Sequence, residues 1–352
     1  MRLLLVTDAW EPQTNGVVST LRETCRELTA MGVTVERISP EGFRTVGCPS
    51  YPEIRLAVLA QAAVDAVFRN FSPDAVHIAT EGPLGHAARA ACLRLGMRFT
   101  TSYHTRFPEY LRARWPVPLG LSYRYLRWFH GAAAQTMVST ASMEHALQAR
   151  GFRNIRRWSR GVDTVRFRPR VVRAGGAPTF VFVGRVAVEK NVEAFLATPL
   201  PGSKLVVGDG PARSTLQGRF PEARFAGMLK GDALVDALAG ADVMVFPSRT
   251  DTFGLVMLEA MACGTPVAAY PVTGPLDVVE HGVTGWLAED LGVAAHFALQ
   301  LDRNACRRAA EQRSWQAAAL QFLGNLIPCR ASTYPLLRRV EKRRLQHADP
   351  AH

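Results

Sequence analysis

Hydrophobic and polar positions follow two alternating patterns along the chain. Short β-branched and apolar runs, typical of buried strands, are each followed by a loop and by a stretch with the period of an amphipathic helix. This strand–helix alternation predicts doubly wound parallel sheets of the α/β class. We expect strands near residues 3–6, 33–40, 74–80, 99–104 and 135–140, and in the second half near residues 179–184, 204–208, 223–229, 242–246 and 266–270.

The alternation is interrupted between residues 168 and 178. This segment, RPRVVRAGGAP, has no periodicity and a composition typical of a linker. We therefore predict a first domain at residues 1–167, a linker at 168–178, a second domain at 179–326 and a basic tail at 327–352. A chain of 352 residues is long enough for two domains with separate cores. Residues 59–70 and 304–324 are expected helices, and residues 51–58 an irregular or edge segment.

Neither a signal peptide nor a membrane span is indicated. The first apolar run, Leu3 to Val6, is too short for the core of a signal peptide. No stretch reaches the ~18 uninterrupted apolar residues that a spanning helix needs. The six cysteines contain no Cys-x-x-Cys pair, which favours free thiols in a reducing compartment over disulfides or zinc. We expect a cytoplasmic protein.

The net charge of +12 is unevenly distributed. Basic residues are clustered at 106–130 and at 328–352, which indicates an acidic partner. Between residues 107 and 130 aromatic side chains are interleaved with arginines, as in helices that lie in a membrane interface. The alternative is a surface helix whose aromatic residues pack inward. Nucleic acid is disfavoured as the partner because no helix-turn-helix, zinc-finger or RNA-recognition signature is present.

The stretch from Pro247 to Val267 carries the clearest candidate chemistry. A buried strand ends at Phe246, a loop contains Asp251, and a helix that starts near Gly254 carries Glu259. Both acids can therefore border one cleft at the carboxyl edge of the sheet, where α/β proteins bind ligands. Free peptide N–H groups around Gly254 and Leu255 would attract phosphate. The alternative is an ordinary unit in which Asp251 caps the helix.

Three other loops carry candidate residues. Asn15-Gly16 follows the first strand and would let the backbone approach a phosphate, although the pair is also a common turn. His104 ends a strand, as catalytic groups often do, although a lone histidine is more often structural. Arg185 and Lys190 follow the first strand of the second half and can converge on one anion, unless they are a solvated pair.

These segments together resemble the glycosyltransferases of family 4, retaining enzymes with the GT-B fold of two Rossmann-like domains facing across a cleft. The resemblance covers the chain to about residue 326. It depends on four motifs in order: Asn15-Gly16; Ser102 to Tyr110; Gly184 to Asn191; and Asp251 to Glu259 with the following Ala-Met-Ala-x-Gly-x-Pro-Val. Members that act on diacylglycerol and the α-mannosyltransferases are the most similar. The family usually has Glu at position 251, so Asp251 is one methylene shorter.

The resemblance implies a role for each candidate. Gly16, Arg185, Lys190, Gly254 and Leu255 would bind the donor diphosphate. The residues implied beside the transferred sugar or the ribose are His104, Asp251 and Glu259, and those implied beside the base are Met228 and Leu229. In this fold the last helices cross back onto the first domain, and the basic tail either follows them or stays loose.

The implied activity is transfer of a hexosyl group from a UDP- or GDP-sugar with retention and without a metal. Fixed cations and helix-end N–H groups would stabilise the leaving diphosphate. The expected acceptor is a membrane lipid such as diacylglycerol, reached by peripheral binding of residues 106–130 to the anionic inner face of the cytoplasmic membrane. The alternatives are a soluble or polysaccharide acceptor, or a non-catalytic protein that binds nucleotide sugars or nucleic acid.

Overall fold

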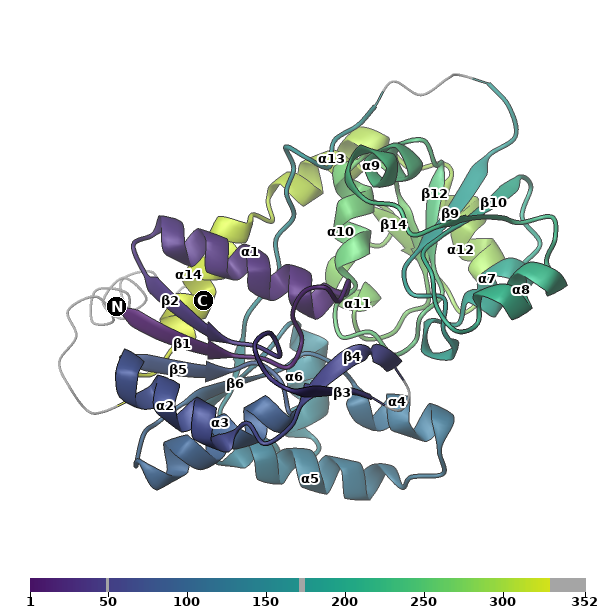
Figure 1. The fold of residues 1–352 in the computed structure, drawn as a ribbon. Coiled ribbons are helices and arrows are strands. Elements are labelled where there is room, and N and C mark those ends of the chain that lie inside the picture. Colours follow the sequence, from purple (N-terminus) through teal and green to yellow (C-terminus); the bar gives the residue numbers. More distant parts are fainter. Residues whose placement is uncertain (49–50, 171–174, 330–352) are drawn as a thin grey trace.

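The computed structural model describes residues 1–48, 51–170 and 175–329. The chain forms two six-stranded parallel sheets, each between layers of helices (Figure 1). The first has the order β2-β1-β5-β6-β7-β8. Its strands are β1 (Arg2–Val6), β2 (Thr34–Ile38), β5 (Ala75–Ile78), β6 (Thr100–Tyr103), β7 (Gln135–Val138) and β8 (Ile155–Arg157). Strands covered on both faces must be apolar throughout, and Leu3 to Val6 are all buried.

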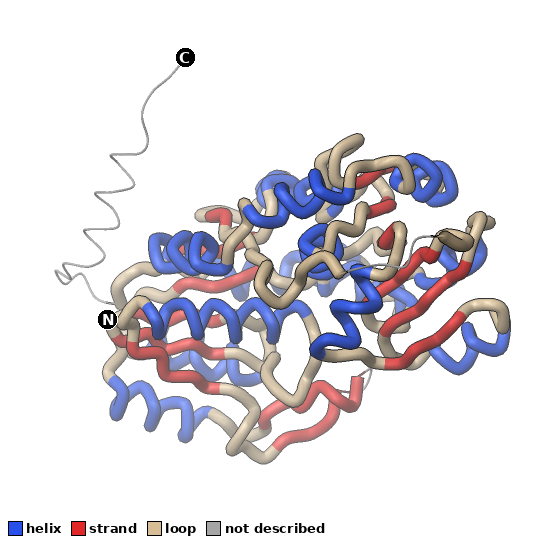
Figure 2. The backbone as a smooth tube through the Cα atoms, turned by 90° about the horizontal axis from the view of Figure 1, so that it is seen from above, coloured by secondary structure: helices blue, strands red, loops and turns tan. Residues whose placement is uncertain are grey.

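The second sheet has the order β11-β10-β9-β12-β13-β14. It consists of β9 (Thr179–Val183), β10 (Ser203–Val207), β11 (Arg224–Gly227), β12 (Val243–Phe246), β13 (Val267–Ala269) and β14 (Gly285–Leu287). All its pairings are parallel, with β9 between β10 and β12. Figure 2 shows both sheets from above, with helices around them. The predicted α/β class with two Rossmann-like halves is confirmed.

Helices cover both faces of the first sheet. On one face α1 (Gly16–Ala30) and α14 (Trp315–Asn325) pack their apolar side chains against Leu3 and Leu5. On the other, α2 (Gln61–Phe71), α3 (Pro83–Arg94) and α5 (Leu119–Gly131) pack against Leu4 and Val6. Two shorter helices complete this domain: α4 (Phe107–Arg114) comes after β6, and α6 (Ala141–Gln148) comes after β7. Successive residues of β1 point to opposite faces of the sheet, so they contribute to two separate cores.

The second sheet is covered in the same way. Its first face packs against α9 (Gly231–Ala239), α10 (Leu255–Ala262) and α13 (Arg303–Glu311). Its second face packs against α7 (Val192–Ala197), α8 (Arg213–Arg219) and α12 (Leu291–Ala298). The remaining elements are the 3-10 turn η1 (Val188–Lys190) and the short helix α11 (Pro275–Val278).

The chain crosses between the domains twice, at places other than the predicted boundaries. Val162 and Phe167 already belong to the core of the second domain. Helix α14 belongs to the core of the first, which confirms the expectation that the last helices cross back onto that domain. The chain therefore leaves the first domain after β8, earlier than the predicted boundary at residue 167. It returns to the first domain after α13, earlier than the predicted boundary at residue 326. Periodicity shows that a helix buries one face, but it does not show against which sheet. Most of the basic tail, residues 330–352, lies outside the described residues.

The two crossings touch at Gly161. A Cβ atom on this residue would lie 2.2 Å from the backbone nitrogen of Trp315 and 2.4 Å from the carbonyl carbon of Ser314. No side chain fits in such a space, so a glycine is required there. The backbone N–H of Val162 also donates to the carbonyl of Arg313 at 2.9 Å. Both connections are thus packed backbone against backbone.

Two further segments add detail to the expectations. The segment expected to be irregular or an edge forms the edge strand β4 (Tyr51–Ala57), which pairs antiparallel with β3 (Thr45–Cys48), a strand that was not predicted. Residues 107–130 form two helices, α4 and α5, because Pro116 and Pro118 lie between them and proline has no N–H to donate. In the described part of the chain we find no helix long and apolar enough to cross a bilayer.

Candidate functional site

The candidate residues come from loops at the carboxyl ends of the strands, where the two domains meet. His104 follows β6, and Gly16 opens α1 after the β1 loop. Arg185 follows β9, and Asp251 lies in the loop after β12. Carboxyl ends of parallel strands carry the ligand sites of open α/β sheets. The fold therefore assembles residues that are far apart in the sequence at one interface.

The loop after β12, residues 247–254, is bonded directly to the first domain through Thr252. The Thr252 hydroxyl donates to the backbone carbonyl of His104 at 2.7 Å. The Thr252 carbonyl accepts hydrogen bonds from Ser139 at 2.9 Å and from Thr140 at 3.4 Å. Asp251, the preceding residue, is therefore held beside the end of β6. These three bonds exist only while the domains are together.

Lys190 and Asp251 form an ion pair in which both side chains are largely buried. Burial alone would lower the pKa of Lys190, but the negative charge of Asp251 outweighs it and raises that pKa above its usual value. Asp251 Oδ1 accepts from Lys190 Nζ. The other oxygen, Oδ2, is buried and has no hydrogen-bond partner among the described residues. One carboxylate oxygen is therefore available to a ligand hydroxyl.

Tyr110 reaches the same pair from the first domain. Its hydroxyl is hydrogen-bonded to Thr250. Burial and the negative charges of Asp251 and Glu189 raise the pKa of Tyr110 to about 12, against the opposing charge of Lys190. Tyr110 lies on α4, whereas Thr250 lies in the loop after β12. The phenol is therefore neutral at physiological pH and can donate or accept a hydrogen bond.

Helix α10 starts at Gly254 with its first N–H groups uncapped by any side chain. Gly254 has φ 83°, and a Cβ there would lie 2.7 Å from the Met257 side chain and 2.9 Å from Phe246. Only glycine adopts this conformation in this space without strain. Gly16 faces the same helix start, since a Cβ on it would meet the Leu255 side chain at 3.7 Å. Uncapped N–H groups at a helix N-terminus are suited to phosphate.

Glu259 lies one turn further along α10. Burial raises its pKa to about 7, and the charge of Arg166 partly opposes this shift. Its carboxylate has no hydrogen bond or ion pair to any other described residue. A desolvated, unpaired carboxylate is unfavourable unless a ligand satisfies it, so Glu259 is poised to accept hydrogen bonds from hydroxyl groups.

His104 is held at both ends. Thr252 binds its carbonyl, and Arg160 donates from Nη2 to its Nδ1 at 3.3 Å. Burial, together with the charges of Arg160, His77 and His130, lowers the pKa of His104 well below 6.5. Its other ring nitrogen, Nε2, is buried with no partner in the described part of the chain. His104 is therefore neutral at physiological pH.

Three other predicted residues, Arg185, Met228 and Leu229, lie just after strands of the second sheet. Arg185 is partly buried just after Gly184, at the end of β9. Met228 follows β11 and is 51% exposed, whereas Leu229 packs against the second-domain core. Their roles toward the diphosphate and the base stay predictions.

Sequence reasoning did not assign a role to three residues of this interface. Thr252 and Tyr110 lie within the motifs at residues 251–259 and 102–110, but spacing alone does not tell which hydroxyl groups of a motif bind the other domain. Arg160 lies in the Arg-Gly-Val-Asp segment at residues 160–163, and the only available signal was an arginine at a domain crossing.

Polar contacts also connect the domains beside this interface. The N–H of Ser142 donates to Asp277 Oδ1 at 3.1 Å, and the Ser142 hydroxyl donates to Asp277 Oδ2. Asp277 lies on α11 and Ser142 in the first turn of α6, so the carboxylate caps a helix of the other domain. Arg313 donates to the Asp277 carbonyl at 3.3 Å.

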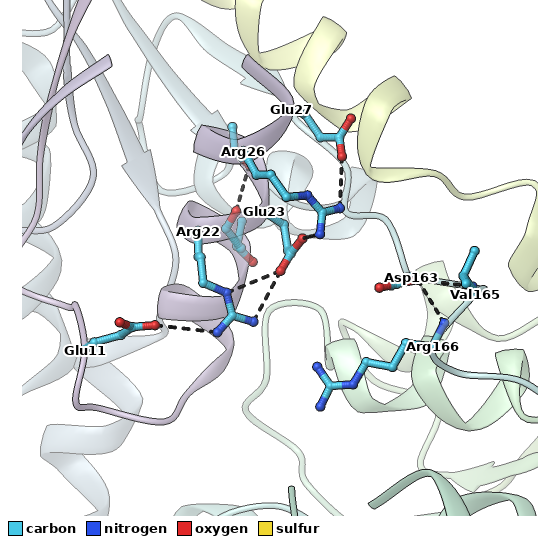
Figure 3. A network of polar contacts seen from close by, with 10 residues as sticks. Glu11, Arg22, Glu23, Arg26, Glu27, Asp163, Val165 and Arg166 are labelled. Carbon is cyan, nitrogen blue, oxygen red and sulfur yellow. Dashed lines mark hydrogen bonds and ion pairs between the residues drawn. The ribbon is translucent and has the colours of Figure 1, made fainter. Parts of the chain in front are cut away.

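A charge network lies on α1, facing the crossing segment at residues 163–166 (Figure 3). Its arginines are exposed, whereas Glu23 is largely buried. Arg22 and Arg26 both pair with Glu23, at 3.2 and 2.7 Å, and Arg26 also pairs with Glu27. Asp163, on the crossing segment, also acts electrostatically on Arg26. Ion pairs whose arginines are exposed to solvent add little stability, and these pairs are within α1, so they do not hold the domains together.

Comparisons with known proteins agree with this geometry. The family model described as Glycosyltransferase Family 4 matches residues 14–166, and the model described as Glycosyl transferases group 1 matches residues 177–303. A GDP-mannose-dependent alpha-mannosyltransferase of Mycobacterium tuberculosis is 31% identical over 92% of this chain and 96% of its own length. The sulfoquinovosyl transferase SQD2 of Arabidopsis thaliana is also 31% identical, over 80% of this chain and 62% of its own length.

Solved structures of low identity share the fold. Sucrose-phosphate synthase from Thermosynechococcus elongatus superposes with a TM-score of 0.71 at 20% identity, covering 91% of this chain and 97% of that one. Anabaena HepE in complex with UDP superposes with a TM-score of 0.66 at 16% identity, covering 92% and 98%. The chain belongs to glycosyltransferase family 4: it is a hexosyltransferase of the GT-B fold that takes its sugar from a nucleotide-sugar donor.

Proposed function

We propose that this enzyme moves a hexosyl group, with retention, from a nucleoside diphosphate sugar to a membrane lipid acceptor such as diacylglycerol, and that it needs no metal. The observation that carries the donor site is the meeting of the Lys190–Asp251 pair with the uncapped start of α10. Relatives that span nearly the whole chain are GDP-mannose-dependent, so GDP-mannose is the first donor to test and UDP-sugars are the second.

In this proposal the diphosphate binds between Gly16 and the start of α10. Lys190 leaves Asp251 for the phosphate oxygens, and Arg185 adds a second positive charge. Fixed cations and N–H groups stabilise the charge that grows on the leaving phosphate. Asp251 then accepts hydrogen bonds from sugar hydroxyls, and Glu259 from the ribose or the sugar.

The transfer step needs no carboxylate nucleophile. The bond from the anomeric carbon to the phosphate oxygen breaks while the acceptor oxygen attacks from the same face, and the leaving phosphate takes the acceptor's proton. Asp251 is unsuited as a nucleophile because in this proposal its oxygens accept hydrogen bonds from the sugar hydroxyls. The absence of a metal requirement is tested by assaying transfer in excess chelator, where an unchanged rate is expected.

The lipid acceptor is supported by the exposed face of α5, which runs along the outer edge of the first domain (Figure 1). Leu121 and Trp128 are each 54% exposed, and Tyr125 is 38% exposed. Arg124 and Arg127 are exposed on the same helix. An apolar and aromatic surface flanked by arginines is suited to a membrane interface. Tyr123 and Phe129, by contrast, are buried, as the alternative of inward-packing aromatic residues predicts for them.

Activity is tested with radiolabelled GDP-mannose and UDP-sugars on lipid extracts containing diacylglycerol. We expect a labelled glycolipid from the wild type and none from Glu259→Ala or Lys190→Ala. Unchanged transfer in both variants would refute the site. Labelled product confined to soluble or polysaccharide acceptors would favour the alternative acceptor class.

Membrane binding is tested by sedimentation with vesicles of anionic lipid at low and high salt. Each basic residue near such a surface contributes about 1 kcal/mol, so Arg124→Glu combined with Arg127→Glu should reduce binding by at least about tenfold. The matched control reverses Arg224 and Arg308, two exposed arginines of the second domain. Equal losses in both pairs would contradict a specific role for α5.

A further inference from the structure

Arg160 is a buried cation whose contacts are all with neutral groups in the described part of the chain. It is 4% exposed, and it donates to the carbonyls of Trp158 and Ser159 as well as to His104. Its guanidinium lies over the Trp158 ring, 4.2 Å from the ring centroid. Buried arginines are usually paired with carboxylates, so this arginine requires another explanation.

The contact with His104 determines which ring nitrogen carries the hydrogen. An arginine has five N–H donors and no acceptor, so the Nδ1 atom that it meets must accept. The hydrogen of a neutral imidazole then lies on Nε2. That atom is the one that is buried and has no partner among the described residues. His104 therefore presents a hydrogen-bond donor with nothing to bind.

We propose that Arg160 is a positioning residue that fixes the tautomer of His104, so that Nε2–H donates a hydrogen bond to an oxygen of the transferred sugar or of the acceptor. The assignment of this oxygen rests on the proposed function, whereas the assignment of the tautomer does not. His104 then takes no part in proton transfer. Its task is to bind and orient an oxygen atom.

The surroundings of Arg160 support a fixed role. The residue follows β8 on the crossing segment, where Gly161 is packed against Ser314 and Trp315. Trp158 also lies edge-on to His104, with ring centroids 5.6 Å apart. The guanidinium is thus held by an aromatic ring and two carbonyls, and the backbone next to it is held by the contact at Gly161. A side chain restrained in this way can hold a neighbouring imidazole in one orientation.

The tautomer is tested by nitrogen-15 NMR of the histidine rings in the full chain, with His104→Gln used for assignment. In the wild type we expect Nε2 protonated and Nδ1 unprotonated. Arg160→Met should give a mixture of tautomers or the opposite one, and Arg160→Lys, which keeps one donor, should keep the wild-type tautomer. A wild-type signal with hydrogen on Nδ1, or an unchanged signal in Arg160→Met, would overturn the proposal.

A matched control separates tautomer effects from loss of stability. Arg307 also donates to carbonyls at the crossing, those of Phe167, Ala262 and Thr164, but does not touch His104. Arg307→Met should lower the melting temperature and leave the His104 signals unchanged. A changed His104 signal in this control would assign the effect to packing and refute the positioning role.

Kinetics test the sugar contact. Arg160→Met should lower kcat by about tenfold or more, the loss expected for a misplaced hydrogen bond, with the donor KM changed less than about twofold. Arg160→Lys should recover part of the loss. An unchanged kcat with an altered tautomer would disprove the sugar contact and leave the tautomer assignment intact. A wild type that is inactive on every donor would refute the proposed function, while the NMR result would still decide the tautomer.

Discussion

The Lys190–Asp251 ion pair joins the residue proposed to bind the phosphate with the residue proposed to bind the sugar. Each side chain satisfies the charge of the other in a largely buried place. A donor would therefore have to replace this pair with its own phosphate and hydroxyl groups. The pair was foreseeable only as two separate motif residues, because nothing in the spacing of positions 190 and 251 tells that their side chains meet.

Asp251→Asn should separate sugar binding from diphosphate binding. The variant loses a charge-assisted contact to the sugar but leaves Lys190 free for phosphate. We expect transfer to fall about ten- to a hundredfold, with affinity for GDP or UDP unchanged or higher, as measured by calorimetry. Equal losses of transfer and nucleotide affinity would contradict the proposed division of roles.

Glu259→Gln should change how stability depends on pH. Burial raises the pKa of Glu259 to about 7. Below pH 4.5 the carboxyl is protonated in both the folded and the unfolded chain and costs nothing. As the pH rises through 7, the folded state has to keep an ionised carboxylate away from water, whereas the unfolded state leaves it solvated. The wild type therefore loses stability.

We therefore expect Glu259→Gln to be about 1–2 kcal/mol more stable than the wild type above pH 8 and equally stable near pH 4.5. Denaturant unfolding at both pH values measures the difference. Donor binding should weaken in the same variant. A variant less stable than the wild type at high pH would mean that the carboxylate is favourably solvated.

At the scale of elements, strands and helices with a clear apolar pattern were predictable. A very short strand, and a segment divided between two helices, were not. Buried strands such as β1 and β12 are read directly from their apolar runs. The four-residue strand β3 contains Gly47 and no clear alternation, so sequence reasoning missed it. The expected membrane segment is divided into α4 and α5, and α5 combines exposed aromatic side chains with arginines along its length.

Helix α10 is the element on which the proposed donor site depends, and its start requires a glycine. Gly254→Ala would place a Cβ 2.7 Å from Met257 and 2.9 Å from Phe246 at a positive φ. We expect a destabilisation of about 1–3 kcal/mol and a loss of GDP or UDP affinity larger than that of a surface variant. Gly218→Ala, within α8 and with no heavy atom near its Cβ position, is the control. Unchanged nucleotide affinity in Gly254→Ala would separate the helix start from the phosphate.

At the scale of the whole molecule, two sets of hydrogen bonds join the domains. One is centred on Thr252 and the other on Asp277. Both sets come from loops or short helices of the second domain and reach strand ends or a helix start of the first. The GT-B architecture was predictable from the repeated alternation, but these bonds were not, because Thr, Ser and Asp are common in loops and their partners lie over a hundred residues away in the sequence.

Thr252→Val combined with Asp277→Asn should shift the chain toward a more open arrangement. Valine keeps the shape of threonine but lacks the hydroxyl that binds His104, and asparagine weakens the cap on α6. We expect a larger radius of gyration by small-angle X-ray scattering. Thr198→Val, which removes a hydroxyl-to-carbonyl bond within the second domain, should leave it unchanged. Identical scattering from the double variant and the wild type would show that these bonds do not hold the domains together.

Helix α14 also determines which pieces of this enzyme can be made separately. Phe322 and Leu323, among the last described residues, complete a core that begins with Leu3 and Leu5. A recombinant fragment that stops at the first crossing would leave that apolar surface bare and should aggregate. Adding residues 315–329 as a separate peptide, or joining them ahead of residue 1 through a flexible spacer, should restore solubility.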